Sequence, residues 1–477
     1  MTSLRRFFPI LALAVLPAEL GAQLSADAVA RVDGVFAQWN SPTSPGCTVA
    51  AAEGGRTILE RAYGMADLEH EVRNTPATII EGGSVSKQFT SAAIVLLALD
   101  GKLSLDDDVR KYLPEVPDYG KTITIRHMMT HTSGLRDWGS VAGITGWPRG
   151  RRAHSHADVL DIVSRQRALN FEPGHEYSYS NTGYNLLAVI VDRVSGMPFA
   201  EFTKQRLFQP VGMTNTQWRD DFTRVVKGRA IGYSPRPGGF SIDMPFENVH
   251  GNGGLLTTVG DLLKWTENLE TGRVGGPAFL EMMHRRGVLN DGNTIGYASG
   301  LMIGTYRGVP EVSHTGSTAG YRAFLTRYPA QNLAIALLCN AGNANPGGLG
   351  HQVADVMLGD RAPEPVRPAQ AGGGGRGAGR GGAQQPAYTP GANELAGFAG
   401  EYYSPDAEVT LVVAVEGNGL VARRRPDTRI VLTPTAADRF NSQLGGIRFI
   451  RDGNGNVTEL SVNQARVYDL RFERVRR

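Results

Sequence analysis

The chain has 477 residues, of which 41% are hydrophobic and 20% are charged, and its formal net charge is +3. This length exceeds that of one ordinary domain, and the composition is typical of a globular protein rather than of a disordered one. The small net charge, with no basic face evident in the sequence, gives no indication of nucleic-acid binding.

The first 22 residues have the pattern of a secretory signal. Arg5 and Arg6 precede an apolar run from Phe7 to Leu16, and Leu20-Gly21-Ala22 offers a cleavage site. The apolar run is too short to span a membrane, and a buried N-terminal helix is the alternative interpretation. The pattern predicts export to the periplasm or to the outside of the cell.

The elements that follow predict the start of an α/β domain. Apolar residues at helical spacing predict a helix over residues 24–40. Two strands are expected next, Cys47 to Glu53 and Arg56 to Tyr63, joined by a glycine turn. Cys47 and Cys339 are the only cysteines, and two cysteines in a long chain are more often free buried thiols, although an oxidising compartment permits a bridge.

Ser84-Val85-Ser86-Lys87 lies directly before a long apolar segment, Gln88 to Asp100, that lacks Gly and Pro and therefore predicts a buried helix. Positions i and i+3 share a helix face, which places the Ser84 hydroxyl beside the Lys87 amine. An apolar setting near the positive end of the helix dipole disfavours the ammonium form, as a lysine base requires. The alternative is an N-capping serine with a surface lysine.

From about residue 100 to 235 the pattern is mostly helical, with loops rich in Pro and Gly. Within it, Tyr177-Ser178-Tyr179-Ser180-Asn181 precedes an apolar helical run from Tyr184 to Val194, so Tyr179 and Asn181 are expected at the turn that opens this helix. Tyr177 competes with Tyr179 for a functional role, but only Tyr179 has an Asn two residues later.

The sheet is expected to resume near residue 295. His314-Thr315-Gly316-Ser317 is predicted to begin an edge strand, followed by strands from Tyr321 to Tyr328 and from Leu333 to Leu338. Gly348 to Leu358 is predicted to form a closing helix.

Three short motifs therefore occur in one order: Ser-x-x-Lys at Ser84, Tyr-x-Asn at Tyr179 and His-Thr-Gly at His314. With this order and spacing the sequence resembles the serine hydrolases that include class C β-lactamases, DD-carboxypeptidases, D-aminopeptidases and related esterases. The resemblance covers about residues 30 to 360. It implies an α/β fold, an antiparallel sheet flanked by helices with an all-helical subdomain, and a site between the two.

The resemblance also implies residue roles. Ser84 is the nucleophile that forms an acyl-enzyme, and Lys87 takes its proton. Tyr179 exchanges protons with the leaving group and the attacking water, and the division of labour between Lys87 and Tyr179 stays open. Asn181 holds Lys87 and a substrate amide. The backbone N–H groups of Ser84 and Ser317 form the oxyanion hole, and the remaining substrate-binding residues are His314, Thr315 and Gly316.

The expected function is an exported serine hydrolase with a small peptide, ester or β-lactam as substrate and with no cofactor or metal. Peptides containing D-amino acids rank first, carboxylic esters second and β-lactams third. A neutral imidazole at His314, where many β-lactamases have Lys, attracts a substrate carboxylate weakly, which predicts weak β-lactamase activity. Two alternatives belong to a different class: a non-catalytic protein that binds penicillins or cell-wall peptides, and a protein whose C-terminal barrel dominates as a lipid- or partner-binding module with the hydrolase as its scaffold.

In the resembled family the first strand lies antiparallel beside the last strand of the sheet. This arrangement implies that Cys47 and Cys339 are neighbours, which allows a disulfide besides the free thiols considered above.

The C-terminal part differs in character. Gly372 to Gly382 contains only Gly, Arg and Ala, which predicts a flexible linker over residues 362–392. Residues 393–477 form short alternating runs that predict about seven or eight strands in a small antiparallel barrel, similar to the lipocalin-like domains appended to some members of the family. Nothing in the barrel has a catalytic pattern. The predicted units are 1–22, 23–361, 362–392 and 393–477.

Several other side chains have competing interpretations. His127 and His131 have the spacing of metal ligands on an expected helix, but no Glu follows the first His, and hydrogen bonding at the helix end is preferred. His154 and His156 are expected in a solvated polar loop. Asp137 and Trp138 either line the cleft or pack a loop.

Overall fold

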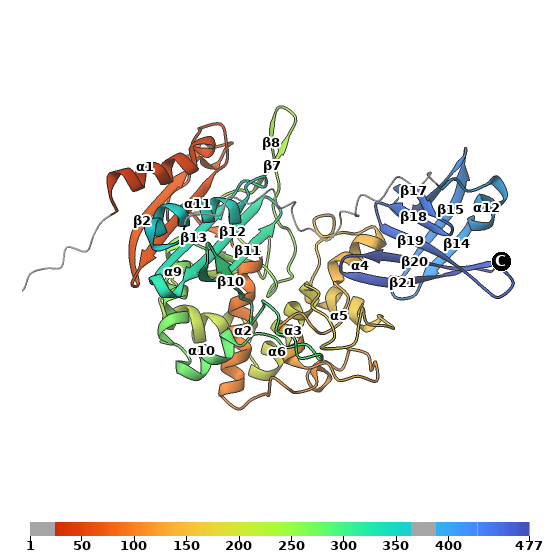
Figure 1. The fold of residues 1–477 in the computed structure, drawn as a ribbon, viewed down its shortest axis with the longest axis horizontal. Coiled ribbons are helices and arrows are strands. Elements are labelled where there is room, and N and C mark those ends of the chain that lie inside the picture. Colours follow the sequence, from red (N-terminus) through yellow and green to blue (C-terminus); the bar gives the residue numbers. More distant parts are fainter. Residues whose placement is uncertain (1–23, 364–387, 427, 477) are drawn as a thin grey trace, which may run out of the picture.

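The computed structural model describes residues 24–363, 388–426 and 428–476 (Figure 1). The predicted signal segment, 1–22, and the Gly372 to Gly382 run lie outside the described residues. The described chain forms an α/β body with an antiparallel sheet, a helical region beside it and a closed antiparallel barrel. The predicted fold class is therefore confirmed.

The central sheet has six strands in the order β10-β11-β12-β13-β1-β2. The first strand pairs antiparallel with the last, which sets Cys47 opposite Cys339, and a disulfide joins these two residues. The free-thiol alternative is wrong for this reason. The strands are β1 Cys47–Glu53, β2 Arg56–Tyr63, β10 Met302–Tyr306, β11 Val309–Thr318, β12 Tyr321–Tyr328 and β13 Leu333–Cys339.

The strand that carries His314 differs from its prediction in two ways. β11 begins at Val309, five residues earlier than predicted, and β10 pairs along its outer side. β10, not β11, is therefore the edge strand. β10 escapes sequence analysis because Met302–Tyr306 is short, contains a Gly and has no buried residue, so it lacks the alternation that marks a half-buried strand.

Helices cover both faces of the sheet. α11 (Pro346–Leu358) packs on β12 and β13, with α1 (Ala26–Val35) beside it, whereas α9 (Val259–Thr271) packs on β1 and β13 from the other face. α1 ends at Val35, short of the predicted residue 40, and a single 3-10 turn, Ala37–Trp39, follows it. α2 (Ser86–Leu99) is buried from Ser86 to Leu97 and packs against α10 (Gly276–His284) and α6 (Asn181–Ser195).

Helices are the regular structure of the region between α2 and β6 (Gln217–Trp218), as predicted, and loops make up the rest. α6 is its long buried helix, and most of the shorter helices pack against it. No helix among the described residues is both long and apolar enough to cross a membrane. The shorter helices are α3 Ile125–Met129, α4 Trp138–Thr145, α5 His156–Ser164, α7 Phe199–Thr203 and α8 Gln209–Val211.

The C-terminal strands close into an eight-stranded antiparallel barrel in which β14 pairs with β21. Its interior is filled by apolar side chains, and Phe398 of α12 (Ala392–Phe398) stacks on Phe449 at 4.4 Å. The strands are β14 Gly400–Ser404, β15 Val409–Glu416, β16 Gly419–Arg424, β17 Thr428–Ala436, β18 Arg439–Ser442, β19 Gly445–Arg451, β20 Val457–Gln464 and β21 Val467–Arg474.

Short strands complete the α/β body. The most important for the site are β5 (Ile80–Glu81) and β9 (Leu255–Thr257), which pair beside Ser84 together with β6. The others are β3 Met65–Asp67, β4 Val72–Arg73, β7 Tyr233–Arg236 and β8 Gly239–Ile242.

Candidate active site

Ser84 lies in a single 3-10 turn, Gly83–Val85, between β5 and α2. Gly83 has φ +50°, and a Cβ atom there would come within 2.6 Å of the Ser317 nitrogen. A Cβ atom on Gly316 would come within 2.0 Å of the Gly82 carbonyl oxygen. Glycine at both positions therefore allows the serine turn and β11 to approach closely, because neither backbone tolerates a side chain there.

Lys87, one helical turn after Ser84, is fully buried at the base of the cleft. Its Nζ lies 3.2 Å from Ser84 Oγ, 3.0 Å from Asn181 Oδ1 and 2.8 Å from the Asn252 carbonyl oxygen. Burial lowers the pKa of Lys87 well below its ordinary value, and the positive charges of Arg149 and Arg466 lower it further. Both effects shift the equilibrium from the ammonium toward the neutral amine.

The partners of Lys87 orient that neutral amine. Carbonyl oxygens only accept hydrogen bonds, so the two hydrogens of the amine go to Asn181 and Asn252. The lone pair then points toward the third neighbour, Ser84 Oγ. This geometry suits proton abstraction from the serine hydroxyl.

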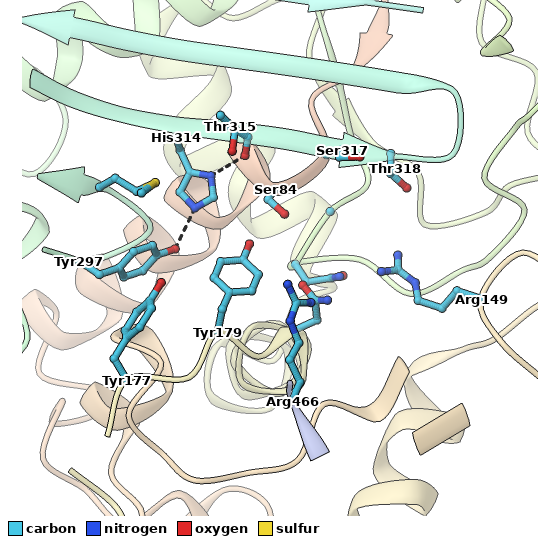
Figure 2. Close-up of a pocket in the computed structure, with 15 residues that line it drawn as sticks. Ser84, Arg149, Tyr177, Tyr179, Tyr297, His314, Thr315, Ser317, Thr318 and Arg466 are labelled. Carbon is cyan, nitrogen blue, oxygen red and sulfur yellow. Dashed lines mark hydrogen bonds between the residues drawn. The ribbon is translucent and has the colours of Figure 1, made fainter. Parts of the chain in front are cut away.

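Tyr179 lies near Ser84, and its hydroxyl points toward the serine (Figure 2). Lys87 Nζ lies 4.8 Å from the centre of the tyrosine ring. Burial raises the pKa of Tyr179 well above its ordinary value. The phenol is therefore protonated at neutral pH and is suited to donating a proton.

Asn181 is the first residue of α6, and its backbone N–H donates to Asp137 Oδ2 at 2.8 Å. Asp137 also caps α4, where Oδ1 accepts from the Ser140 N–H, and Trp138 Nε1 donates to Asn185 Oδ1 at 2.8 Å. Neither Asp137 nor Trp138 lines the cleft. Of the two interpretations of this pair, packing is therefore the correct one.

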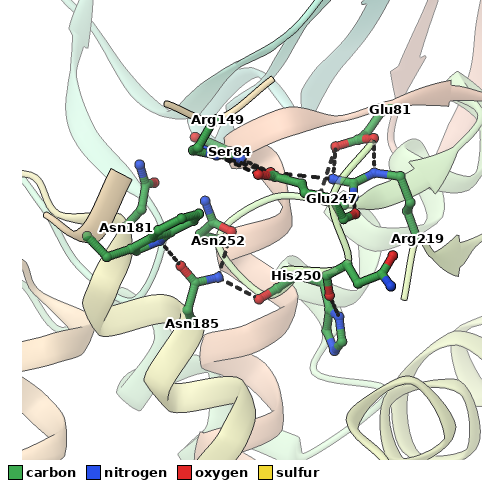
Figure 3. Close-up of polar contacts among 12 residues, drawn as sticks. Glu81, Ser84, Arg149, Asn181, Asn185, Arg219, Glu247, His250 and Asn252 are labelled. Atoms are coloured by element: carbon green, nitrogen blue, oxygen red, sulfur yellow. Dashed lines mark hydrogen bonds and ion pairs between the residues drawn. The ribbon is translucent and has the colours of Figure 1, made fainter. Parts of the chain in front are cut away.

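A buried chain of charges lies behind the nucleophile (Figure 3). Arg219 donates to Glu81, the residue before Gly82, at 2.9 Å, and also to the Glu247 carbonyl oxygen. The Glu247 carboxylate accepts two hydrogen bonds from Arg149, which lines the cleft. Glu81 also accepts from the Gly254 N–H at 3.0 Å, so this chain links the serine turn to the loop that presents Asn252.

His314 is buried in the cleft wall with both ring nitrogens occupied. Nδ1 lies 2.6 Å from the Thr315 carbonyl oxygen, and Nε2 lies 3.0 Å from the Tyr297 hydroxyl (Figure 2). Because the carbonyl only accepts, Nδ1 carries the hydrogen and Nε2 accepts from the tyrosine. Burial and the nearby Lys87 lower the pKa of His314 to about 4, so the imidazole is neutral.

Two predictions about the other histidines are wrong. His131 does not share a helix with His127, because α3 ends at Met129 and His131 has φ 59°. His127 does cap the start of α3, the hydrogen-bonding role that the sequence favours. His154 is buried and contacts the Trp147 carbonyl oxygen, and His156 Nε2 lies 3.0 Å from the His250 carbonyl oxygen. Neither is in a solvated loop, because the segment packs against residues 247–250.

The cleft encloses about 430 Å³ and contains all the motif residues named above except Lys87 at its base and the buried Gly316. Further side chains that sequence analysis does not identify also line it, among them Arg149, Tyr297 and Arg466. Arg466 comes from the turn between β20 and β21 of the barrel. No motif marks these residues, because long-range packing alone brings them to Ser84.

One group of potential metal ligands occurs among the described residues, Asp67, Glu69 and His70. It is largely exposed and lies outside the cleft, and His70 Nδ1 is 2.7 Å from Asp67 Oδ2. This group does not contribute to the site around Ser84.

Known proteins resemble this chain over the region that contains the site. A model of the Beta-lactamase family matches residues 32–357. Penicillin-binding protein 4* of Bacillus subtilis is 31% identical over 61% of this chain and 67% of its own length. D-aminopeptidase of Cereibacter sphaeroides is 25% identical over 86% of this chain and 72% of its own length. The chain spans 59% of the length of protein flp of Staphylococcus aureus, at 27% identity over 62% of the chain.

Structural similarity extends further along the chain. The octameric penicillin-binding protein homologue from Pyrococcus abyssi has a TM-score of 0.63 and 22% identity, over 94% of this chain and 99% of that one. At this identity the similarity concerns the fold. The family match, which covers most of the chain and all three motifs, shows that the chain belongs to the Beta-lactamase family of serine hydrolases.

Proposed function

We propose that this protein is an exported hydrolase that cleaves an amide or ester bond through an acyl-enzyme on Ser84, with peptides containing D-amino acids as its main substrates. The observation that carries the proposal is the position of Lys87. Its neutral amine is 3.2 Å from Ser84 Oγ, and its two hydrogens are held by carbonyl oxygens.

Acylation follows from this arrangement. Ser84 Oγ attacks the substrate carbonyl carbon as its proton passes to Lys87 Nζ, and the C–O bond forms. The backbone N–H groups of Ser84 and Ser317 stabilise the oxyanion. When the tetrahedral intermediate collapses, the bond to the leaving amine or alcohol breaks, and Tyr179 supplies the proton that the leaving group needs.

Deacylation reverses these roles. A water molecule attacks the ester carbon of the acyl-enzyme and loses its proton to the Tyr179 oxygen, which gave up a proton in the first step. Ser84 then leaves and regains its proton from Lys87, which restores the starting state. The acid released is the acyl part of the substrate.

Three observations support the choice of substrate and location. The relative from Cereibacter sphaeroides that bears the name D-aminopeptidase aligns with 86% of this chain. Residues 1–22 have the composition of a secretory signal, and the Cys47–Cys339 disulfide is of a kind that persists in oxidising compartments.

The test is to compare Ser84→Ala and Lys87→Ala with wild type on p-nitrophenyl esters, D-aminoacyl anilides and nitrocefin. Each variant is expected to lose at least ~1,000-fold in kcat/KM on every substrate, because the two residues act as one catalytic unit. Ser164→Ala, at the exposed end of α5, is the matched control and retains full activity. A Ser84→Ala protein with a tenth of wild-type turnover would end the assignment.

A further inference from the structure

The barrel places a positive charge in the cleft. Arg466 lines the cleft, and its guanidinium lies 4.9 Å from the centre of the Tyr179 ring (Figure 2). Among the described residues no carboxylate lies within ion-pair distance of Arg466, whereas the other cleft arginine, Arg149, is paired with Glu247. A partly buried guanidinium without a carboxylate, held against an aromatic ring, is suited to binding an anion.

The turn that carries Arg466 is fastened to the helical region. The Arg466 carbonyl oxygen accepts hydrogen bonds from the Asp137 N–H at 3.2 Å and from Asn170 Nδ2 at 3.0 Å. The Tyr468 N–H donates to Asn170 Oδ1 at 2.8 Å. Asp137 also holds the Asn181 N–H. The position of Arg466 is therefore tied to the residue that orients Asn181 beside Lys87.

A buried ion pair fixes the barrel at the same place. Asp406, in the turn after β14, lies 2.8 Å from Arg136 Nη1 and 2.7 Å from Arg167 Nε. The side chains of Arg136 and Asp406 are 2% and 5% exposed. Arg136 also donates to the Tyr468 carbonyl oxygen at 3.1 Å, two residues from Arg466. These buried contacts hold the turn that carries Arg466 in a fixed position at the cleft.

The other groups in the cleft do not supply this charge. His314 is neutral, and both of its nitrogens have partners within the protein. Lys87 is needed as an uncharged base, and the charge of Arg149 is largely neutralised by Glu247. Among the cleft-lining residues that the structure describes, Arg466 is thus the permanent positive charge that remains for a substrate.

We propose that Arg466 binds a carboxylate of the substrate, so that the barrel completes the active site and the enzyme prefers acidic peptides or esters. The inference rests on the proposed function, because it names the substrate class of that same site. If Arg466 did not bind a carboxylate, it would serve only to pack on Tyr179. Substitution of Arg466 would then affect charged and neutral substrates alike.

The test uses two pairs of esters that differ in one carboxylate. p-Nitrophenyl butyrate and mono-p-nitrophenyl glutarate differ in the acyl group, and 4-acetoxybenzamide and 4-acetoxybenzoate differ in the leaving group. For each pair the ratio of kcat/KM, anionic to neutral, is measured in wild type, Arg466→Gln and Arg466→Lys. Arg439→Gln, at an exposed arginine of β18 that does not line the cleft, is the matched control.

In at least one pair, Arg466→Gln is expected to lower the ratio by roughly 10-fold to 100-fold, the range for loss of a charged hydrogen bond. Arg466→Lys retains most of the ratio, Arg439→Gln retains all of it, and added salt lowers it in wild type but not in Arg466→Gln. The pair that responds shows which side of the scissile bond carries the carboxylate. Equal ratios in wild type and Arg466→Gln for both pairs would overturn the inference, whereas the proposed function fails only if Ser84→Ala keeps its turnover.

Discussion

Lys87 shows how single residues set the chemistry of this site. An amine buried beside two arginines favours its neutral form, and two carbonyl oxygens turn its lone pair toward Ser84. The i, i+3 spacing of Ser84 and Lys87 predicts their contact from sequence, because both lie on one helix face. The partner loop at Asn252 cannot be predicted in this way, since it lies 165 residues further along the chain.

His314 is the residue whose protonation links the site to stability. Burial and Lys87 lower its pKa from 6.5 to about 4 in the folded protein. In the unfolded chain it titrates near the ordinary value, so between pH 6.5 and pH 4 only the unfolded chain binds a proton at this position. The unfolding free energy therefore decreases as the pH falls through this window. Above pH 6.5 the contribution of His314 to stability is fully present.

His314→Gln tests this linkage, because glutamine can donate to the Thr315 carbonyl and accept from Tyr297 without titrating. Between pH 7 and pH 5, wild type is expected to lose about 2 kcal/mol more unfolding free energy than His314→Gln. Urea denaturation at each pH gives the values, with His175→Gln, at an exposed histidine, as the control that follows wild type. Parallel pH curves for wild type and His314→Gln would show that residue 314 is not held neutral.

At the scale of elements, strands with strong alternation or long apolar runs are predictable, and short ones are not. β1, β2 and β12 have the predicted bounds, and β13 extends one residue beyond its prediction, because apolar runs and turns define them locally. β5, β6 and β9 contain two or three residues each and leave no pattern. Yet these three strands hold the serine turn, since the Gly82 N–H donates to the Leu255 carbonyl at 2.8 Å.

Arg219→Gln tests the buried charges that join these short strands to the site. It leaves the carboxylate of Glu81, which is fully buried, without its ionic partner, and breaking one side of such a pair costs about 3–5 kcal/mol. Arg206→Gln breaks the exposed pair with Asp100 and is expected to cost less than ~1 kcal/mol. Urea denaturation of the two variants measures the loss of unfolding free energy in each. Equal losses would show that the Glu81–Arg219 pair does not stabilise the fold more than an exposed pair does.

For the whole molecule, the sequence predicts a barrel, but its placement against the hydrolase body is not predictable. Alternation within each short run indicates strands, because it depends on neighbouring residues. Docking depends on contacts across more than 200 residues of sequence, such as Asp406 with Arg136 and Gln166. The sequence of the barrel contains no catalytic motif that we identify, yet Arg466 of the barrel lines the cleft.

The docking of the barrel can be weakened without touching the cleft. Asp406→Ala leaves the buried Arg136 guanidinium without its carboxylate, which favours separation of the barrel from the helical region. Small-angle X-ray scattering is expected to show a larger radius of gyration than wild type. Because separation withdraws Arg466, the anionic-to-neutral ester ratio should fall toward that of Arg466→Gln.

Asp438→Ala, which breaks the surface pair with Arg451 on the barrel, is the matched control and should change neither quantity. Combining Asp406→Ala with Arg466→Gln should lower the ester ratio no further than Arg466→Gln alone, because both changes remove the same contact. Additive losses would mean that Asp406 acts on the cleft by another route. A larger radius with an unchanged ratio would mean that substrate selection does not depend on where the barrel sits.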